Sequence, residues 1–110
     1  MNAEDMQRSA QAAADLMKAL SSENRLMLLC QLVDGEKTVG ELAGSLRLRQ
    51  AAVSQQLALL RKDGLVSARR DGRQMHYCLT GQEARAIIKL LYELYCAPAK
   101  QTAAPCPSGA

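Results

Sequence analysis

The sequence predicts a mainly helical fold that carries a β-hairpin wing, the winged helix-turn-helix. Two helix-forming segments, at about residues 38–46 and 50–63, are separated by only a few residues. The second ends at Gly64, and two strand-forming segments joined by Asp71-Gly72 follow it. Helix, turn, helix and hairpin in this order are typical of proteins that read duplex DNA, so the order predicts a DNA-binding function.

Two further helices are expected before this unit. Apolar residues recur near helical spacing over residues 4–20. A second helix is expected over residues 23–33, with Ser21 or Ser22 as its cap. The next helix should begin after Thr38, because Glu41 stands three residues on and completes a capping box.

The helix expected over residues 50–63 has two distinct faces. Val53, Leu57 and Leu60 recur at i, i+4 and i+7, so they are expected to face the core. The other face carries amide, hydroxyl and methyl groups. Amides can pair with adenine edges, hydroxyls can pair with several bases, and methyl groups can contact the methyl group of thymine. An ordinary polar face is the alternative. We predict a base-reading face, whose DNA-binding residues are Gln50, Ala51, Ser54 and Gln55.

The wing is expected to have strands at residues 65–70 and 73–80, joined by a pair preferred in type I′ turns, Asp71-Gly72. Strand alternation places His76 on the outward face. Three arginines near the tip are expected to reach phosphates or the minor groove, namely Arg69, Arg70 and Arg73.

The last helix, expected over residues 82–96, is apolar nearly all round. A domain this small cannot bury such a helix alone. We therefore predict a homodimer through the first and last helices, which would offer two reading helices to a palindromic operator. Residues 1–96 form the DNA-binding and dimerisation domain in this interpretation, and residues 97–110 form a flexible C-terminal tail.

Charge and composition favour duplex DNA as the partner. The chain has 110 residues and a net charge of +3, with +5 in residues 47–76 and −3 in residues 1–46. A basic reading helix and wing suit duplex phosphates. The chain has no Phe and no Trp, so it lacks the stacking platform of single-strand binders. There is no long apolar run or signal peptide, so we expect a cytoplasmic protein with no membrane partner.

Over about residues 9–96 the chain resembles the ArsR/SmtB family of small winged-helix repressors. The resemblance rests on A-L-S-S-E-N-R-L-M-L-L, V-G-E-L-A, A-V-S-Q-Q-L-A-L-L-R-K-D-G-L-V and R-D-G-R-Q-M-H-Y-C-L. Within the family the chain is similar to the persulfide-sensing branch of SqrR, BigR and HlyU type. Two cysteines carry that similarity, Cys30 in L-L-C-Q-L and Cys96 in L-Y-C.

The resemblance implies a thiol-based transcriptional repressor without a cofactor. The reduced dimer would bind double-stranded operator DNA. Reactive sulfur species would then link the redox-sensing residues Cys30 and Cys96 and lower DNA affinity. One position departs from the family pattern, because Gln56 stands where the family's reading helix often has His.

Four cysteines in a protein expected in the cytoplasm suggest redox or metal chemistry. Cys30 among leucines also fits a small buried hydrophobe. An arsenite- or metal-responsive repressor would draw on three thiolates, those of Cys30, Cys96 and Cys106. His76 and Cys78 supply only two of the four ligands that zinc normally takes, so no metal site is predicted.

Two other classes of function fit less well. An enzyme would need a nucleophile–base pair, paired acids or a phosphate loop. Cys30 and His76 form a conceivable pair but lie in no such motif, so we predict no enzyme. A dimeric scaffold that does not bind DNA would not explain why the predicted reading helix and wing are basic.

Overall fold

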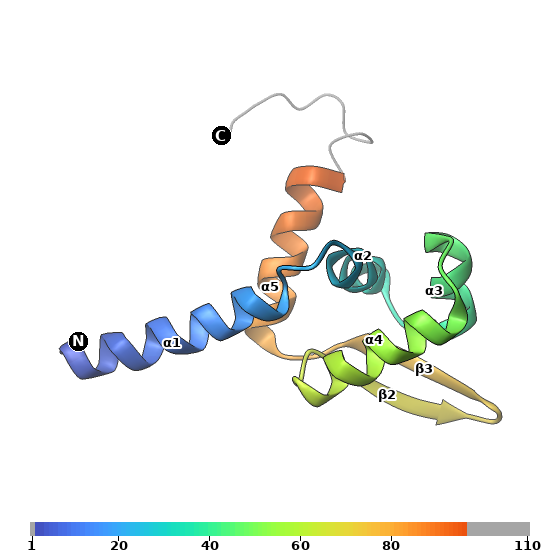
Figure 1. Cartoon of the computed structure of the whole chain (residues 1–110), viewed down its shortest axis with the longest axis horizontal. Helices are drawn as coiled ribbons and strands as arrows, with labels where there is room; N and C mark the ends of the chain where they lie inside the picture. The colour runs from blue at the N-terminus through green and yellow to red at the C-terminus, as the bar shows by residue number, and fades with distance from the viewer. Residues whose placement is uncertain (1, 97–110) are drawn as a thin grey trace.

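The computed structural model describes residues 2–96, and its elements follow the expected order (Figure 1). They are α1 (Ala3–Ala19), α2 (Glu23–Gln31), a 3₁₀ turn η1 (Leu32–Asp34), β1 (Lys37–Thr38), α3 (Val39–Leu46), α4 (Gln50–Lys62), β2 (Val66–Asp71), β3 (Gln74–Leu79), α5 (Gln82–Leu91) and a π-helical turn η2 (Tyr92–Cys96). The structure therefore confirms a mainly helical winged helix-turn-helix.

The core lies between α2, α3, α4, α5 and the sheet. Val53, Leu57 and Leu60 are fully buried, as the spacing along α4 predicts. Leucines of α2 and α3 and the inward side chains of β2, β3 and α5 complete the core. Burial of this apolar surface is the main term that holds the reading helix in place.

The predicted helix caps are present. Ser22 caps α2, and its Oγ accepts a hydrogen bond from the backbone N–H of Arg25 at 3.4 Å. Thr38 and Glu41 form the predicted capping box, with the Thr38 N–H donating to Oε1 of Glu41 at 2.8 Å. The tight turn between α3 and α4 passes through Arg47, which has a left-handed φ of 58°. These contacts fix where each helix starts and how α4 leaves α3.

The wing differs from the prediction in having a third strand. The two-residue strand β1 pairs antiparallel with β3, so the sheet order is β1-β3-β2. Thr38 lies opposite His76 in this pairing. The His76 side chain, predicted to face outward, is 21% exposed, and its Nε2 lies 3.9 Å from the exposed carboxylate of Asp71.

The hairpin turn is shifted by one residue. Asp71 pairs with Gln74, so the central residues of the turn are Gly72 and Arg73 and not Asp71-Gly72. Gly72 has a φ of 66°, while Arg73 does not have a positive φ. A positive φ at the first central position alone is the pattern of a type II′ turn. The predicted type I′ turn is thus corrected, and Arg73 stands at the tip itself.

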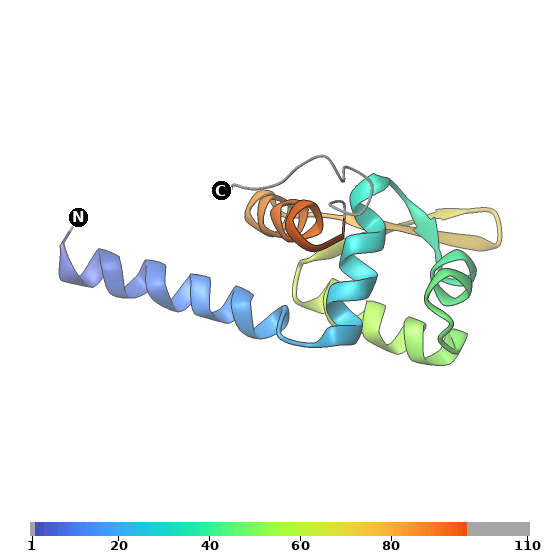
Figure 2. The same cartoon turned by 90° about the horizontal axis from the view of Figure 1, so that it is seen from above.

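The first helix projects from the rest of the chain in both views (Figures 1 and 2). None of its 17 residues is buried. Large apolar side chains are exposed on this helix at Met6 and Met17, and on α5 and η2 at Leu90, Leu94 and Tyr95. Within residues 2–96, no helix is long and apolar enough to cross a membrane.

Candidate nucleic-acid interface and dithiol site

The predicted reading face is exposed along the first half of α4. Gln50, Ala51, Ser54 and Gln55 are all exposed. Because the opposite face of α4 is locked into the core, these side chains are presented on a rigid element. The helix and the β2–β3 hairpin lie on the side of the fold away from the end of α5 (Figure 1). This arrangement suits a helix in the major groove with a wing beside it.

Gln56 has a different position from its neighbour Gln55. Its side chain is half-buried, and Oε1 accepts a hydrogen bond at 3.2 Å from Nε of Arg25 in α2. Arg25 also donates from Nη1 to the backbone carbonyl of Ala19 at 3.3 Å. The residue that departs from the family pattern therefore joins α4 to α2.

The three predicted phosphate-binding arginines are not equivalent. Arg70 and Arg73 are exposed, and within residues 2–96 neither has an acidic partner. Arg69 donates from Nε and Nη2 to the Glu36 carboxylate at 2.8–3.0 Å. These hydrogen bonds, with the positive charge of Arg69, hold the pKa of Glu36 below its ordinary value. Glu36 thus remains ionised and neutralises one wing arginine.

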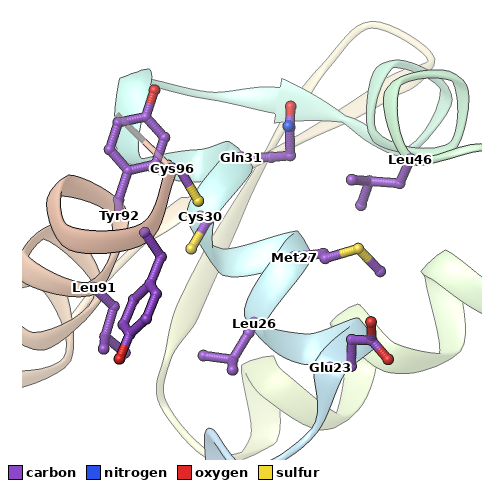
Figure 3. Close-up of a pocket in the computed structure, with 10 residues that line it drawn as sticks. Glu23, Leu26, Met27, Cys30, Gln31, Leu46, Leu91, Tyr92 and Cys96 are labelled. Atoms are coloured by element: carbon purple, nitrogen blue, oxygen red, sulfur yellow. The ribbon is translucent and has the colours of Figure 1, made fainter. Parts of the chain in front are cut away.

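The structure brings Cys30 and Cys96 together, although they lie 66 positions apart in the chain. Cys30 lies on α2 and Cys96 on η2, and their sulfur atoms face one another (Figure 3). Cys30 is half-buried, whereas Cys96 is exposed. Burial, followed by the neighbouring Cys96, raises the pKa of Cys30 from 9.0 to about 11. Cys30 is therefore a neutral thiol near pH 7, and solvent reaches Cys96 more easily.

The two thiols lie at one end of a cavity of about 470 Å³ that follows α2. Glu23, Cys30 and Gln31 share one face of α2 and line it. The rest of the cavity lining is apolar or aromatic and is formed by Leu26, Met27, Leu46, Leu91, Tyr92 and Tyr95. The volume is within the range of small-molecule sites.

The other thiols are not part of this cavity. Cys78 lies on β3, with its Sγ 3.2 Å from Oγ of Ser67 on β2. His76, two residues away on the same strand, approaches Asp71 at 3.9 Å. Among residues 2–96, no three His, Cys, Asp or Glu side chains converge as metal ligands. Cys106, the third thiolate of the arsenite alternative, lies outside the described residues, as does the predicted tail.

Sequence reasoning did not find three features of these sites. Glu36 was missed because nothing in its local sequence links it to Arg69, which is 33 positions away. The Arg25–Gln56 contact spans 31 positions and gave no signal beyond the unusual Gln. The cavity was missed because Leu26 and Leu91 fit the apolar pattern of a core, although here they line a hollow.

Comparisons with known proteins agree with this geometry. A family model described as "Bacterial regulatory protein, arsR family" matches residues 22–68. The transcriptional activator HlyU of Vibrio cholerae is 46% identical over 87% of this chain and 89% of its own length. The biofilm growth-associated repressor of Xylella fastidiosa is 45% identical over 92% and 89%.

The similarity extends to solved structures. The structure of the repressor BigR from Xylella fastidiosa superposes with a TM-score of 0.83 at 44% identity, covering 91% of this chain and 99% of that chain. Reduced HlyU from Vibrio cholerae superposes with a TM-score of 0.80 at 45% identity, covering 84% and 98%. The chain therefore belongs to the arsR family of bacterial regulatory proteins and is a DNA-binding transcriptional regulator of the winged helix-turn-helix class.

Proposed function

We propose that this protein is a homodimeric, thiol-based repressor that binds operator DNA when reduced and leaves it when reactive sulfur species join Cys30 to Cys96. One observation carries the proposal, namely the meeting of these two thiols across α2 and η2. A thiol pair that closes covalently is the simplest switch that this geometry offers, because it needs only an accessible thiol beside a second one.

Binding to operator DNA is supported by the reading face and the wing. Gln50, Ser54 and Gln55 offer amide and hydroxyl groups for base edges. Arg70 and Arg73 offer charge to the phosphates without a competing carboxylate in the described part of the chain. The relatives named as a repressor and an activator support a role in transcription.

Dimerisation is supported by the unpartnered apolar surface of α1 and α5. A second cavity, of about 700 Å³, lies between these helices and is lined by small and apolar side chains such as Ala12, Leu16 and Ile87. Leu90 of α5 and Leu94 of η2 are exposed as well. A second copy packing on this surface would bury it and hold two α4 helices at a fixed spacing.

The chemistry of the switch is a two-electron oxidation of the thiol pair by a polysulfide. Cys96, the exposed thiol, attacks a sulfur–sulfur bond as its thiolate and expels a hydrosulfide ion. Cys30 then gives up its proton and attacks the sulfur chain now attached to Cys96, which expels a second hydrosulfide ion. Hydrogen trisulfide would leave one extra sulfur atom between the cysteines, and two hydrogen sulfide molecules carry away the protons and electrons.

Closure of the bridge has a direct mechanical route to the reading helix. Cys30 and Arg25 lie on the same helix, α2, and Arg25 is hydrogen-bonded to Gln56 of α4. A bridge that pulls α2 toward η2 would therefore change how α2 supports α4. Any change in the spacing of the two α4 helices away from the roughly 34 Å operator repeat would weaken binding to both half-sites.

The test is DNA binding before and after treatment with sodium tetrasulfide. The probe is a duplex selected from a random-sequence pool by the reduced protein, and binding is followed by fluorescence anisotropy. Wild-type protein should release the duplex, with added sulfur between Cys30 and Cys96 in the mass spectrum. Cys30→Ser and Cys96→Ser should bind normally and fail to release it, while Cys78→Ser and Cys106→Ser should behave as wild type.

Two outcomes would overturn the switch. Release by arsenite with no response to tetrasulfide would replace it by the three-thiolate alternative, especially if Cys106→Ser abolished that response. Release of DNA from Cys30→Ser by tetrasulfide would show that the pair is not the sensor.

A further inference from the structure

The cavity beside the thiol pair has features that the switch chemistry alone does not require. A simple dithiol switch needs two sulfur atoms and access for the oxidant. Here the thiols open into a hollow of about 470 Å³ that follows α2. Its lining includes the apolar side chains of Leu26, Met27 and Leu91 and the side chains of Tyr92 and Tyr95. An apolar cavity of this size favours a ligand with hydrocarbon or aromatic groups.

The charges along the cavity favour a neutral ligand. Glu23, an exposed residue in the first turn of α2, lines the cavity, and among residues 2–96 no Lys or Arg lines it. Figure 3 places Glu23 at the far end of the cavity from the two sulfur atoms. An anionic ligand would meet this carboxylate without a compensating cation, and its own charge would lose hydration against apolar walls.

We propose that the cavity binds uncharged organic polysulfides, such as dialkyl trisulfides, and holds their sulfur chain against Cys96 and Cys30. The alkyl groups lie along Leu26 and Met27, and the sulfur chain lies at the thiol end. The proposal extends the proposed function by naming the class of sulfur donor. The site itself, however, is defined by ligand chemistry and can be tested without DNA.

The reaction with such a donor balances as follows. The Cys96 thiolate attacks an alkyl-bearing sulfur of R–S–S–S–R, which forms Cys96–S–S–R and expels R–S–S⁻. The Cys30 thiol then loses its proton and attacks the sulfur of Cys96, which forms the Cys30–Cys96 disulfide and expels R–S⁻. The two thiol protons leave on R–S–S–H and R–S–H. Two cysteines are oxidised, and one sulfur–sulfur bond of the donor is reduced.

The test compares donors that share one reactive group and differ in charge and polarity. Reduced full-length protein is mixed with dipropyl trisulfide, bis(2-hydroxyethyl) trisulfide or bis(2-carboxyethyl) trisulfide, and disulfide formation is timed by mass spectrometry. Each rate is divided by the rate of N-acetylcysteine with the same donor, which cancels intrinsic reactivity. The normalised rate should be at least about tenfold higher for the dipropyl than for the dicarboxylate donor, because its terminal methyl groups gain by leaving water, whereas carboxylates would lose hydration against the apolar walls.

Two variants tie this preference to the cavity. Glu23→Gln should raise the normalised rate with the dicarboxylate donor and leave the rate with the dipropyl donor unchanged. Met27→Gln should slow the dipropyl donor several-fold, because it places an amide on the apolar wall. Met6→Gln, which makes the same change on the exposed start of α1, should have no effect on any donor.

The failure of this inference differs from the failure of the proposed function. Equal normalised rates for all three donors, or a Met27→Gln protein that keeps the full preference, would overturn the ligand site while tetrasulfide could still release DNA. Conversely, a strong preference with no effect of the bridge on DNA binding would leave the ligand site standing and remove the regulatory role.

Discussion

Arg69 in β2 and Glu36, just before β1, form an ion pair in which Nε and Nη2 of the arginine lie 2.9 Å and 2.8 Å from the two carboxylate oxygens. The Arg69 side chain remains 54% exposed, so a DNA phosphate could reach it. A phosphate that bound Arg69, as predicted, would compete with Glu36 for the same donors. An exposed ion pair is weak, which means that the competition can go either way.

Replacing the carboxylate should strengthen binding to any duplex. Glu36→Gln removes the negative charge and frees Arg69, so affinity for random-sequence DNA should rise a few-fold. The slope of log affinity against log salt should steepen by up to about 0.9, as expected for one more phosphate contact. Anisotropy titrations at several salt concentrations measure both quantities. The effect should vanish in a protein that also carries Arg69→Ala, and a persisting effect there would contradict the competition.

The neighbours Gln55 and Gln56 should respond differently to the same change. Gln55→Ala should cost about 1–3 kcal/mol of operator binding and little on random DNA, because an exposed amide that reads a base is lost. Gln56→Ala removes the acceptor of Arg25, so it should lower the unfolding temperature and weaken binding to both duplexes alike. Equal loss of specificity in the two variants would show that the reading face is wrongly assigned.

The dimer should depend on the exposed leucines of the C-terminal helix. Leu94 is 59% exposed within one chain, and a charge there would be buried against a second copy. Leu94→Glu should therefore give monomers in sedimentation velocity at micromolar concentration. Lys89→Glu is the matched control, because Lys89 is an exposed polar residue of α5 and its replacement should leave the dimer intact. A folded wild-type monomer under these conditions would refute the interface.

The raised pKa of Cys30 predicts two pH dependences. Alkylation of Cys30 by iodoacetamide, followed by peptide mapping, should be slow near pH 7 and should increase toward pH 11. The folded protein holds this proton more tightly than the unfolded chain does. The contribution of Cys30 to the free energy of unfolding is therefore complete below pH 9.0 and is lost as the pH rises to about 11. Cys96→Ser should lower the Cys30 pKa only in part, since burial is the larger cause.

Cys30→Ala provides the control for the stability measurement. The free energy of unfolding, measured with urea, should fall less between pH 9.0 and about 11 in this variant than in the wild type. An unchanged decline would mean that other groups account for it.

The sequence was sufficient for the helices and for the face of α4. Periodic burial at Val53, Leu57 and Leu60 and the capping box at Thr38 are local signals, and each depends on residues within a few positions of one another. The exposed positions of Gln50, Ser54 and Gln55 followed directly from that periodicity. The adjacency of Cys30 and Cys96 came only from family resemblance, because no local pattern links α2 to η2.

The remaining features depend on contacts between distant segments. A strand of two residues such as β1 has too little sequence for any alternation to appear. Its pairing with β3 brings Glu36, the residue before β1, within hydrogen-bond distance of Arg69, a contact that no local pattern indicates. The turn at Gly72-Arg73 was misplaced because the register of β2 and β3 fixes it, and an Asp-Gly pair alone does not.

Helix α1, none of whose residues is fully buried, has a consequence for how the regulator responds to its own abundance. A helix of 17 residues that buries none of them is close to the length at which isolated helices are marginal in water. If a second copy orders it, as proposed, assembly of the DNA-binding species rises with the square of chain concentration until dimers predominate. Gene dosage and synthesis rate would then set the threshold of repression.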